Sequence, residues 1–289
     1  MENIVKVGIV VYAALFLNVG TAVAGKDCTN TSTYADHRDS NTAGLDENQN
    51  PKDGYCYQTP TNMDVKIYEV GICTAHASPN DRTACTLLFD DANGQLVNLS
   101  VGSSLDLLEE ISITEGTYSH AYILMSNVTA IKTVIQFSTS RTALDNSSGE
   151  YCYTNGDSWD DNVNSIMSCG DSASAAVSSV ETIGFADENG NDSYSIVPYT
   201  VTMAGEQVVS NLYMTDADGT TPSSSESTSK RILGSQKLGN QVTVTPSTSN
   251  IDVSFAITDG VAIGFPNDQS LTGPHDAVFE ALKFKITAN

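Results

Sequence analysis

The sequence predicts an all-β protein, an antiparallel β-sandwich of immunoglobulin-like or jelly-roll-like type with long polar loops and disulfides. Three observations favour this class. Short segments with alternating apolar residues recur at spacings of roughly 8–15 residues, which is typical of a sandwich. Polar stretches rich in Gly, Asn, Asp and Ser separate these segments, and no segment has a convincing helical period.

Residues 1–24 have the pattern of a secretory signal sequence. Lys6 supplies the positive start, Val7–Leu17 is the apolar run, and Ala22-Val23-Ala24 is a small-residue cleavage site. The apolar run is shorter than the roughly 20 residues of a membrane-spanning helix. We therefore expect a mature chain that begins at Gly25, is not inserted in a membrane, and is secreted to the extracellular space, the cell surface or the periplasm.

The charge of the chain excludes several classes of partner. The 289 residues carry 35 acidic side chains against 13 Lys and Arg, which gives a formal net charge of −22. Such a chain has no general attraction for nucleic acid or for anionic lipid. Hydrophobic residues make up 40% of the chain, too many for a wholly disordered protein.

Six cysteines follow the signal sequence, an even number that predicts disulfides in an exported chain. The simplest of the 15 pairings is sequential and closes only short loops. A metal site is less favoured because the chain has no C-x-x-C and His76 near Cys73 has no second His at ligand spacing. The sequential scheme pairs Cys28 with Cys56, Cys73 with Cys85, and Cys152 with Cys169.

Residues 25–61 are polar and predict an N-terminal arm held by the first cysteine pair, with the sandwich domain over 62–289. Alternation over 63–67 predicts a strand, and a change of phase predicts a bulge near Tyr68. The segments 86–89 and 96–101 flank Asn93-Gly94, a pair typical of a tight hairpin.

The middle of the chain gives further strands. Residues 104–114 predict either a helical turn before a strand or a bent strand, and residues 117–125 predict a strand. In that strand Tyr118, His120, Tyr122 and Leu124 share one face, and Ala121, Ile123 and Met125 the other. A turn at Ser126-Asn127 leads to a strand over 131–137.

Residues 138–193 predict an irregular insertion, and the Ser-rich stretch 216–230 a mobile loop. This loop could instead link two domains, but the segment after it is short for a separate core. The remaining predicted strands are 194–203, 207–214, 241–245, 251–257, 261–265 and 282–286.

No catalytic motif stands out. The four histidines are scattered, and His120 is best explained as a half-buried side chain with a hydrogen-bond partner. There is no G-x-S-x-G, no phosphate-binding loop and no dinucleotide fingerprint. Adjacent acidic pairs are expected by chance in so acidic a chain; they are Asp90/Asp91, Glu109/Glu110 and Asp160/Asp161.

Two candidate binding sites rest on composition. Trp159, with Tyr151 and Tyr153 nearby, would suit stacking against a sugar ring, or would anchor a loop beside the Cys152–Cys169 bridge. Two acidic loops offer hard oxygen ligands for calcium as a cofactor, although both are also typical of turns. Their ligands would be Asp187, Asn189, Asn191 and Asp192 in one loop, and Asp216 and Asp218 in the other.

These observations favour an exported, non-enzymatic structural or interaction protein at the cell surface, such as a subunit of a filament, sheath or adhesive layer. Its partners would be copies of itself or other surface proteins, and glycans are a further candidate. A secreted carbohydrate- or calcium-binding module and a secreted hydrolase with an unrecognised acid pair stay open as alternatives. The arm 25–61 or the C-terminal segment 278–289 could add a strand to a neighbouring copy, unless the latter completes its own sheet.

Overall fold

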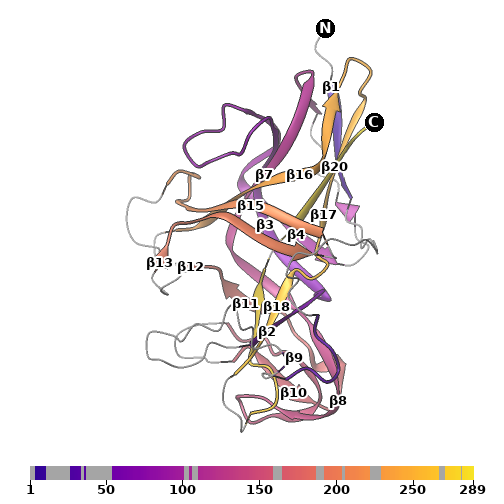
Figure 1. The fold of residues 1–289 in the computed structure, drawn as a ribbon, viewed down its shortest axis with the longest axis vertical. Coiled ribbons are helices and arrows are strands. Elements are labelled where there is room, and N and C mark those ends of the chain that lie inside the picture. Colours follow the sequence, from indigo (N-terminus) through magenta and orange to yellow (C-terminus); the bar gives the residue numbers. More distant parts are fainter. Residues whose placement is uncertain are drawn as a thin grey trace.

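The structure, a computed structural model, is all-β (Figure 1). It describes residues 4–10, 27–33, 36, 54–100, 104–105, 110–158, 165–186, 192–203, 206–221, 229–266, 271–280 and 282–289. The strand pairs are antiparallel except for β1 (Ile4–Val10), which runs parallel to β17 (Asn250–Ala256). A 3-10 turn lies at Ala173–Ala175, and among the described residues no helix is long and apolar enough to span a membrane.

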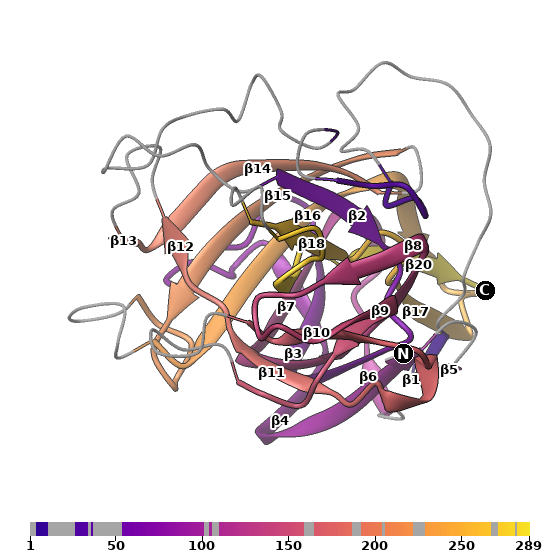
Figure 2. The same ribbon diagram turned by 90° about the horizontal axis from the view of Figure 1, so that it is seen from below.

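The largest sheet contains the longest strands, in the order β14-β15-β16-β7-β3-β4, and β11 also pairs with β7. Figure 2 shows these strands following one another around the molecule. Their bounds are β3 Asn62–Cys73, β4 Cys85–Ser100, β7 Gly116–Lys132, β11 Ser179–Thr182, β14 Ser195–Met203, β15 Glu206–Thr215 and β16 Arg231–Val244.

The alternation in β3 is confirmed, and so is its bulge. Met63, Val65 and Ile67 are fully buried, as a half-buried strand requires. The pairing of β3 with β4 shifts in register between Ile67 and Glu69, which places the irregularity at Tyr68.

The predicted hairpin at Asn93-Gly94 is wrong. Strand β4 is continuous, because Ile67 pairs with Gln95 and Glu69 with Asp90 along the same antiparallel ladder. Residues 91–94 have no partners in β3, and at Gln95 the strand resumes its pairing with β3 in the same direction. Gly94 has φ +71°, and the Asn93 N–H donates to the Asp91 carboxylate over 2.8 Å. A positive φ suits a bulge as well as a hairpin turn, so the local signal could not separate the two.

The predicted turn at Ser126-Asn127 is also wrong, because β7 continues through it. Asn127 is buried, and its backbone N–H donates to the Lys230 carbonyl oxygen at the start of β16. The chain changes sheets slightly later, at Thr133. This buried residue exchanges hydrogen bonds with Thr154 and leads into β8.

Three smaller sheets complete the fold, together with the ribbon β12-β13. Their orders are β20-β17-β1-β5, with β6 also on β1, then β10-β9-β8 and β19-β18-β2. The stretch 138–193, irregular by sequence, contains β9 to β13. The bounds are β2 Gly54–Gln58, β5 Ser104–Leu105, β6 Glu110–Ser112, β8 Val134–Thr142, β9 Ser148–Thr154, β10 Met167–Gly170, β12 Phe185–Ala186, β13 Asp192–Ser193, β18 Val261–Phe265, β19 Asp276–Phe279 and β20 Lys283–Ala288.

The large sheet buries side chains on both faces. Ala121, Ile123 and Met125 of β7 belong to the main core, whereas Tyr122 and Leu124 join a smaller cluster with Leu233 on the other face. This alternation was predicted, except for Tyr118, which lies in the main core. The β7–β16 pairing shifts in register between Lys237 and Val242, opposite the step from His120 to Tyr118.

The three disulfides follow the predicted sequential scheme, and no described cysteine is free. Cys28–Cys56 ties the N-terminal stretch to β2, where Cys28 also donates its N–H to Tyr57. Cys73–Cys85 joins the ends of β3 and β4. Cys152–Cys169 joins β9 to β10.

Candidate functional site

Strand β1 occupies an inner position in its sheet, with a partner along each edge. Residues 6–9 pair in parallel with residues 250–253 of β17. On its other edge, residues 4–6 pair antiparallel with β6 and residues 9–10 with β5. Both rows of backbone donors and acceptors of β1 therefore serve the sheet.

The neighbour of β1 is fixed in the core. Ile251, Val253 and Phe255 of β17 have no exposed surface. The far edge of β17 pairs antiparallel with β20, from Ile251 opposite Ala288 to Ala256 opposite Lys283. Figure 1 shows β1, β17 and β20 side by side at the end of the molecule that carries both termini. The C-terminal strand thus completes its own sheet in this chain, the simpler of the two expectations for residues 278–289.

The position of β1 coincides with the predicted signal sequence, since residues 4–10 lie within residues 1–24. Removing them would leave residues 250–253 of β17 and residues of β5 and β6 without backbone partners. Unpaired strand edges bind other extended chains readily. We call the space between β17 and the β5–β6 segments the β1 slot.

A second feature is an apolar cavity of about 190 Å³ beneath the large sheet, on the main-core face. It lies among β7, β14, β15, β16 and the segment that follows β19. Tyr199, Ser210, Gln236 and Glu280 contribute its polar lining groups. The apolar lining includes Ile123, Met125, Ile196, Leu212, Ile232 and Phe279.

Glu280 supplies the one carboxyl group among the residues that line the cavity. Its backbone N–H donates to the Gly260 carbonyl oxygen, and its carboxylate accepts a hydrogen bond from the Tyr199 hydroxyl. Burial raises the pKa of Glu280 above its ordinary value, although the hydrogen bond from Tyr199 acts in the opposite direction. Burial, followed by the nearby Glu280 charge, also raises the pKa of the Tyr199 hydroxyl.

Glu181 on β11 lies close to the cavity and is only 7% exposed. Its carboxylate accepts a hydrogen bond from the Phe279 N–H over 2.6 Å. Burial raises the pKa of Glu181 to about 8, with Asp276 and Glu280 adding to the shift and the Phe279 hydrogen bond opposing it. Glu181 is therefore mostly a neutral carboxylic acid at pH 7, and can act as a hydrogen-bond donor or a proton source.

Sequence reasoning missed this pair of acids. It paired Asp90 with Asp91 and two other sets by adjacency, whereas the fold brings Glu181 close to Glu280 from distant parts of the chain. One local signal was present, because Glu181 has the same strand parity as the buried Ile183. Of the adjacent pairs, Asp90 is exposed on β4. Glu109, Asp160 and Asp161 lie outside the described residues.

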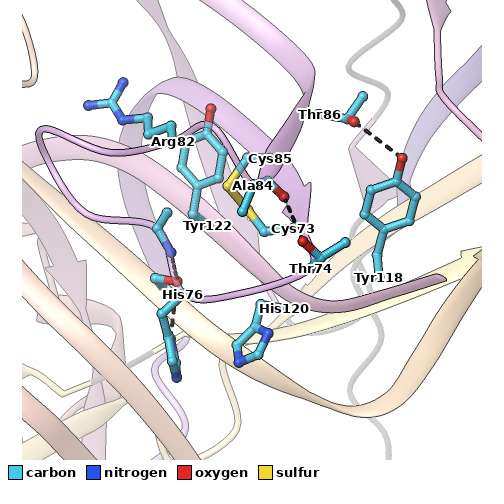
Figure 3. The surroundings of a disulfide bond; sticks show 12 residues. Cys73, Thr74, His76, Arg82, Ala84, Cys85, Thr86, Tyr118, His120 and Tyr122 are labelled. Atoms are coloured by element: carbon cyan, nitrogen blue, oxygen red, sulfur yellow. Dashed lines mark hydrogen bonds between the residues drawn. A yellow bond between two sulfur atoms is a disulfide. The ribbon is translucent and has the colours of Figure 1, made fainter. Parts of the chain in front are cut away.

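Two histidines meet beside the Cys73–Cys85 disulfide (Figure 3). The ring centroids of His76 and His120 are 4.3 Å apart. Nδ1 of His76 lies 3.2 Å from the Ser235 hydroxyl, and Nδ1 of His120 lies 2.8 Å from the Ser119 hydroxyl. His120 is therefore half-buried with a hydrogen-bond partner, as expected.

Burial is the main cause that lowers the pKa of both histidines, and Lys237 lowers them further. Each ring is thus neutral at pH 7 and could in principle ligate a metal. Among the described residues, however, no cluster of three or more His, Cys, Asp or Glu side chains has a metal-binding arrangement. The pair resembles a packed edge-to-face contact more than a metal site.

Arg82 and Tyr122 lie on the other side of the same disulfide (Figure 3) and belong to a polar network beside the smaller core cluster. Arg82 donates through one guanidinium nitrogen to both Glu69 carboxylate oxygens, at 3.0 and 2.7 Å, and through the other to the Gly219 carbonyl oxygen. The Tyr122 hydroxyl also donates to Glu69. These bonds join β3, β7 and two loops, which is a structural role.

Three of the six predicted calcium ligands lie outside the described residues. Asp187, Asn189 and Asn191 lie there, and Asp192 belongs to β13. Asp218 is exposed, and its carboxylate accepts hydrogen bonds from the Thr220 N–H and hydroxyl, which hold its pKa below the ordinary value. Asp216 exchanges backbone hydrogen bonds with Thr220 and Gly219 in the same turn. Calcium binding here stays a prediction.

The proposed stacking site is only partly described. Tyr151 and Tyr153 are half-buried on β9 and flank the disulfide-bonded Cys152. Trp159 lies outside the described residues. In comparisons of the chain with known proteins, no family model, no curated protein and no solved structure matches it.

Proposed function

We propose that the protein is an exported, non-enzymatic structural or interaction protein of the cell surface, and that copies associate by strand addition. In this proposal the sheets pack as a β-sandwich, and filaments, sheaths or adhesive layers are the assemblies formed. The observation that carries the proposal is the inner position of β1, a strand that lies within a predicted signal sequence.

Export is supported by the three disulfides. Disulfides persist in oxidising compartments and are rare in the cytosol. The net charge of −22 suits a surface protein in an aqueous medium, because it keeps free subunits soluble and apart. Specific contacts must therefore drive any association.

Removal of the predicted signal sequence supports strand addition, because it would leave an unpaired edge on β17. Cleavage before Gly25 would remove β1 and open the β1 slot along the core strand β17. An extended segment of another subunit could then pair with β17 in the direction that β1 takes, parallel to it. Backbone hydrogen bonds supply much of the affinity in such contacts, and alternate side chains supply selectivity.

The fold limits which segment of the chain could donate the added strand. Strand β20 is engaged with its own β17, so the C-terminal segment is the weaker candidate. In the arm, residues 54–58 form β2 and pair with β18. The rest of the arm between Cys28 and Cys56 is therefore the better candidate, and a head-to-tail contact of this kind that does not close would produce a filament.

The first experiment compares the mature chain with and without a replacement strand. Residues 25–289 would be exported from a heterologous signal sequence, so that the disulfides form. We expect them to sediment as assemblies, and a peptide of residues 3–11 to bind and release monomers. The matched control is the same peptide with Val7→Pro, which lacks the N–H needed for pairing inside a sheet.

Two outcomes would contradict the proposal. One is a folded monomer of residues 25–289 that ignores the peptide, which would mean that β5 and β6 close onto β17 within the chain. The other is an unfolded mature chain that the peptide does not rescue. A mature chain that folds only with the peptide would support the β1 slot as an acceptor.

A deletion identifies the donor. Replacing residues 37–52 by a short Gly-Ser linker retains β2 and both ends of the Cys28–Cys56 bridge. Loss of assembly with retained peptide binding would assign the donor to the arm. Unchanged assembly would exclude the arm.

A further inference from the structure

The apolar cavity has the dimensions of a small-ligand site. Its volume is about 190 Å³, whereas an engineered apolar cavity of ~150 Å³ holds a benzene molecule. Side chains from β7, β14, β15 and β16 supply one wall, and residues after β11 and around the end of β19 supply the rest. A molecule with one ring or a short branched chain would fit there.

The polar end of the cavity is acidic. Glu280 and the Tyr199 hydroxyl form this end, and no Lys, Arg or His is among the residues that line the cavity. The acidic groups nearest to it are Glu181 on β11 and Asp276 on β19, which interact electrostatically with one another. The net charge of −22 adds a general attraction for cations.

Charge and shape together define the class of ligand. We propose that the cavity binds a small primary amine with an apolar body, whose ammonium group pairs with the Glu280 carboxylate. The body of the amine then contacts Ile123, Leu212 and Ile232, and the Tyr199 hydroxyl fixes the carboxylate. This site is independent of strand addition.

The proton balance of binding follows from the site. The amine enters as an ammonium ion, and Glu280 must be ionised to pair with it. When Glu280 is protonated beforehand, its proton passes to the buffer as the ion pair forms. Binding below the pKa of Glu280 therefore releases a proton, whereas binding of a neutral analogue does not.

The test uses three probes of nearly the same shape on the exported protein with its disulfides intact. They are benzylamine, benzyl alcohol and toluene, measured by calorimetric titration over a series of pH values in two buffers of different ionisation enthalpy. We expect benzylamine to bind at one site about tenfold more tightly than benzyl alcohol, and to release protons at the pH values where the free Glu280 carboxyl is protonated. Equal affinities for the amine and the alcohol, or no binding of the amine, would overturn the proposal.

Variants then locate the site. Glu280→Gln should reduce benzylamine affinity about tenfold and abolish proton release, because it removes the ionisable partner. Gly234→Val should block all three probes, because Gly234 lines the cavity and its added methyl groups would enter it. The control is Gly239→Val on the same strand, where an added Cβ would meet nothing within 4 Å. Benzylamine binding that survives Gly234→Val in a folded protein would overturn this assignment.

Discussion

Strand β7 runs for 17 residues in the large sheet, whereas β10 at the other end of the molecule has four. The neighbours of β7 are also long, with 12 residues in β3 and 14 in β16. In the small sheets β2, β18 and β19 have five, five and four residues. A long strand can bury many side chains and pair with two neighbours over its whole length, and a short strand cannot.

The positions of the disulfides can be compared with this difference in strand length. Cys28–Cys56 and Cys152–Cys169 hold strands of the small sheets, and Cys73–Cys85 lies at the ends of two long strands. Two of the three covalent links thus occur where strand pairing is short, and the third joins two long strands. In the large sheet the burial of apolar side chains on two faces does most of the stabilisation.

The largest expected effect compares two disulfides directly. Cys152→Ser with Cys169→Ser should lower the free energy of unfolding by about 3 kcal/mol. Cys73→Ser with Cys85→Ser should cost less, because β3 and β4 stay paired along their length. The two loops have similar lengths, 17 and 12 residues, so loop entropy alone predicts nearly equal losses. Denaturant unfolding measures both variants. Equal losses in the free energy of unfolding would contradict the expectation that long paired strands depend less on their disulfide.

The next largest effect concerns Glu181, which links the large sheet to the small sheet that contains β19. Glu181 is on β11, which pairs with the large sheet, and its carboxylate binds the N–H of Phe279 on β19. Because its pKa is raised to about 8, the folded state holds a proton that the unfolded state loses near its ordinary value. The contribution of Glu181 to stability is complete at low pH and is lost as the pH rises to about 8.

Glu181→Gln should remove this dependence. Between pH 5.5 and 7.5 the wild type should lose about 2–3 kcal/mol relative to the variant, at up to roughly 1.4 kcal/mol per pH unit for one proton. Melting curves of both proteins across this range measure the difference. Parallel curves would show that Glu181 titrates alike in the folded and unfolded chain.

A smaller effect tests the bulge in the large sheet. Gly94→Ala should cost about 1 kcal/mol, because φ is +71° and the new Cβ would lie 2.7 Å from a Tyr68 ring carbon. Gly116→Ala is the matched control in the same sheet, where the nearest atom is 3.9 Å away. A Gly94→Ala protein as stable as the control would show that the bulge relaxes freely.

The smallest effect concerns His76, in the loop after β3, and His120 on β7. Lys237→Met should raise the pKa of both His76 and His120, because it removes a positive charge that opposes their protonation. The pKa values should stay below the ordinary histidine value, since burial is the larger cause. Proton NMR titration of the imidazole C–H signals measures both rings, and unchanged values would exclude the contribution of Lys237.

Periodicity in the sequence was sufficient for the all-β class, the buried face of β3 and the bulge at Tyr68. It failed at Asn93-Gly94 and at Ser126-Asn127. Residues typical of turns are present there, but β4 and β7 continue past them because they stay paired with neighbouring strands. Pairing partners decide that outcome, and they lie far away in the sequence. The cysteine pairing was predictable because short loops close most easily.

The sites were less predictable for a related reason. The acidic end of the cavity depends on Tyr199 and Glu280, which are 81 positions apart in the sequence and meet only in the folded chain. Their neighbours in the sequence carry no motif for ligand binding. The β1 slot was hidden in another way, because one short apolar segment satisfies the pattern of a signal sequence and of a strand.

The passage of the chain through Thr133 has a mechanical consequence. Strands β7 and β8 are joined by that one residue, so together they form one of the backbone connections between the end with both termini and the opposite end (Figure 1). The part of a pull between the two ends that runs along β7 would load its bonds with β3 and β16 in shear. The protein would withstand such a pull better than a force that peels one strand from its edge.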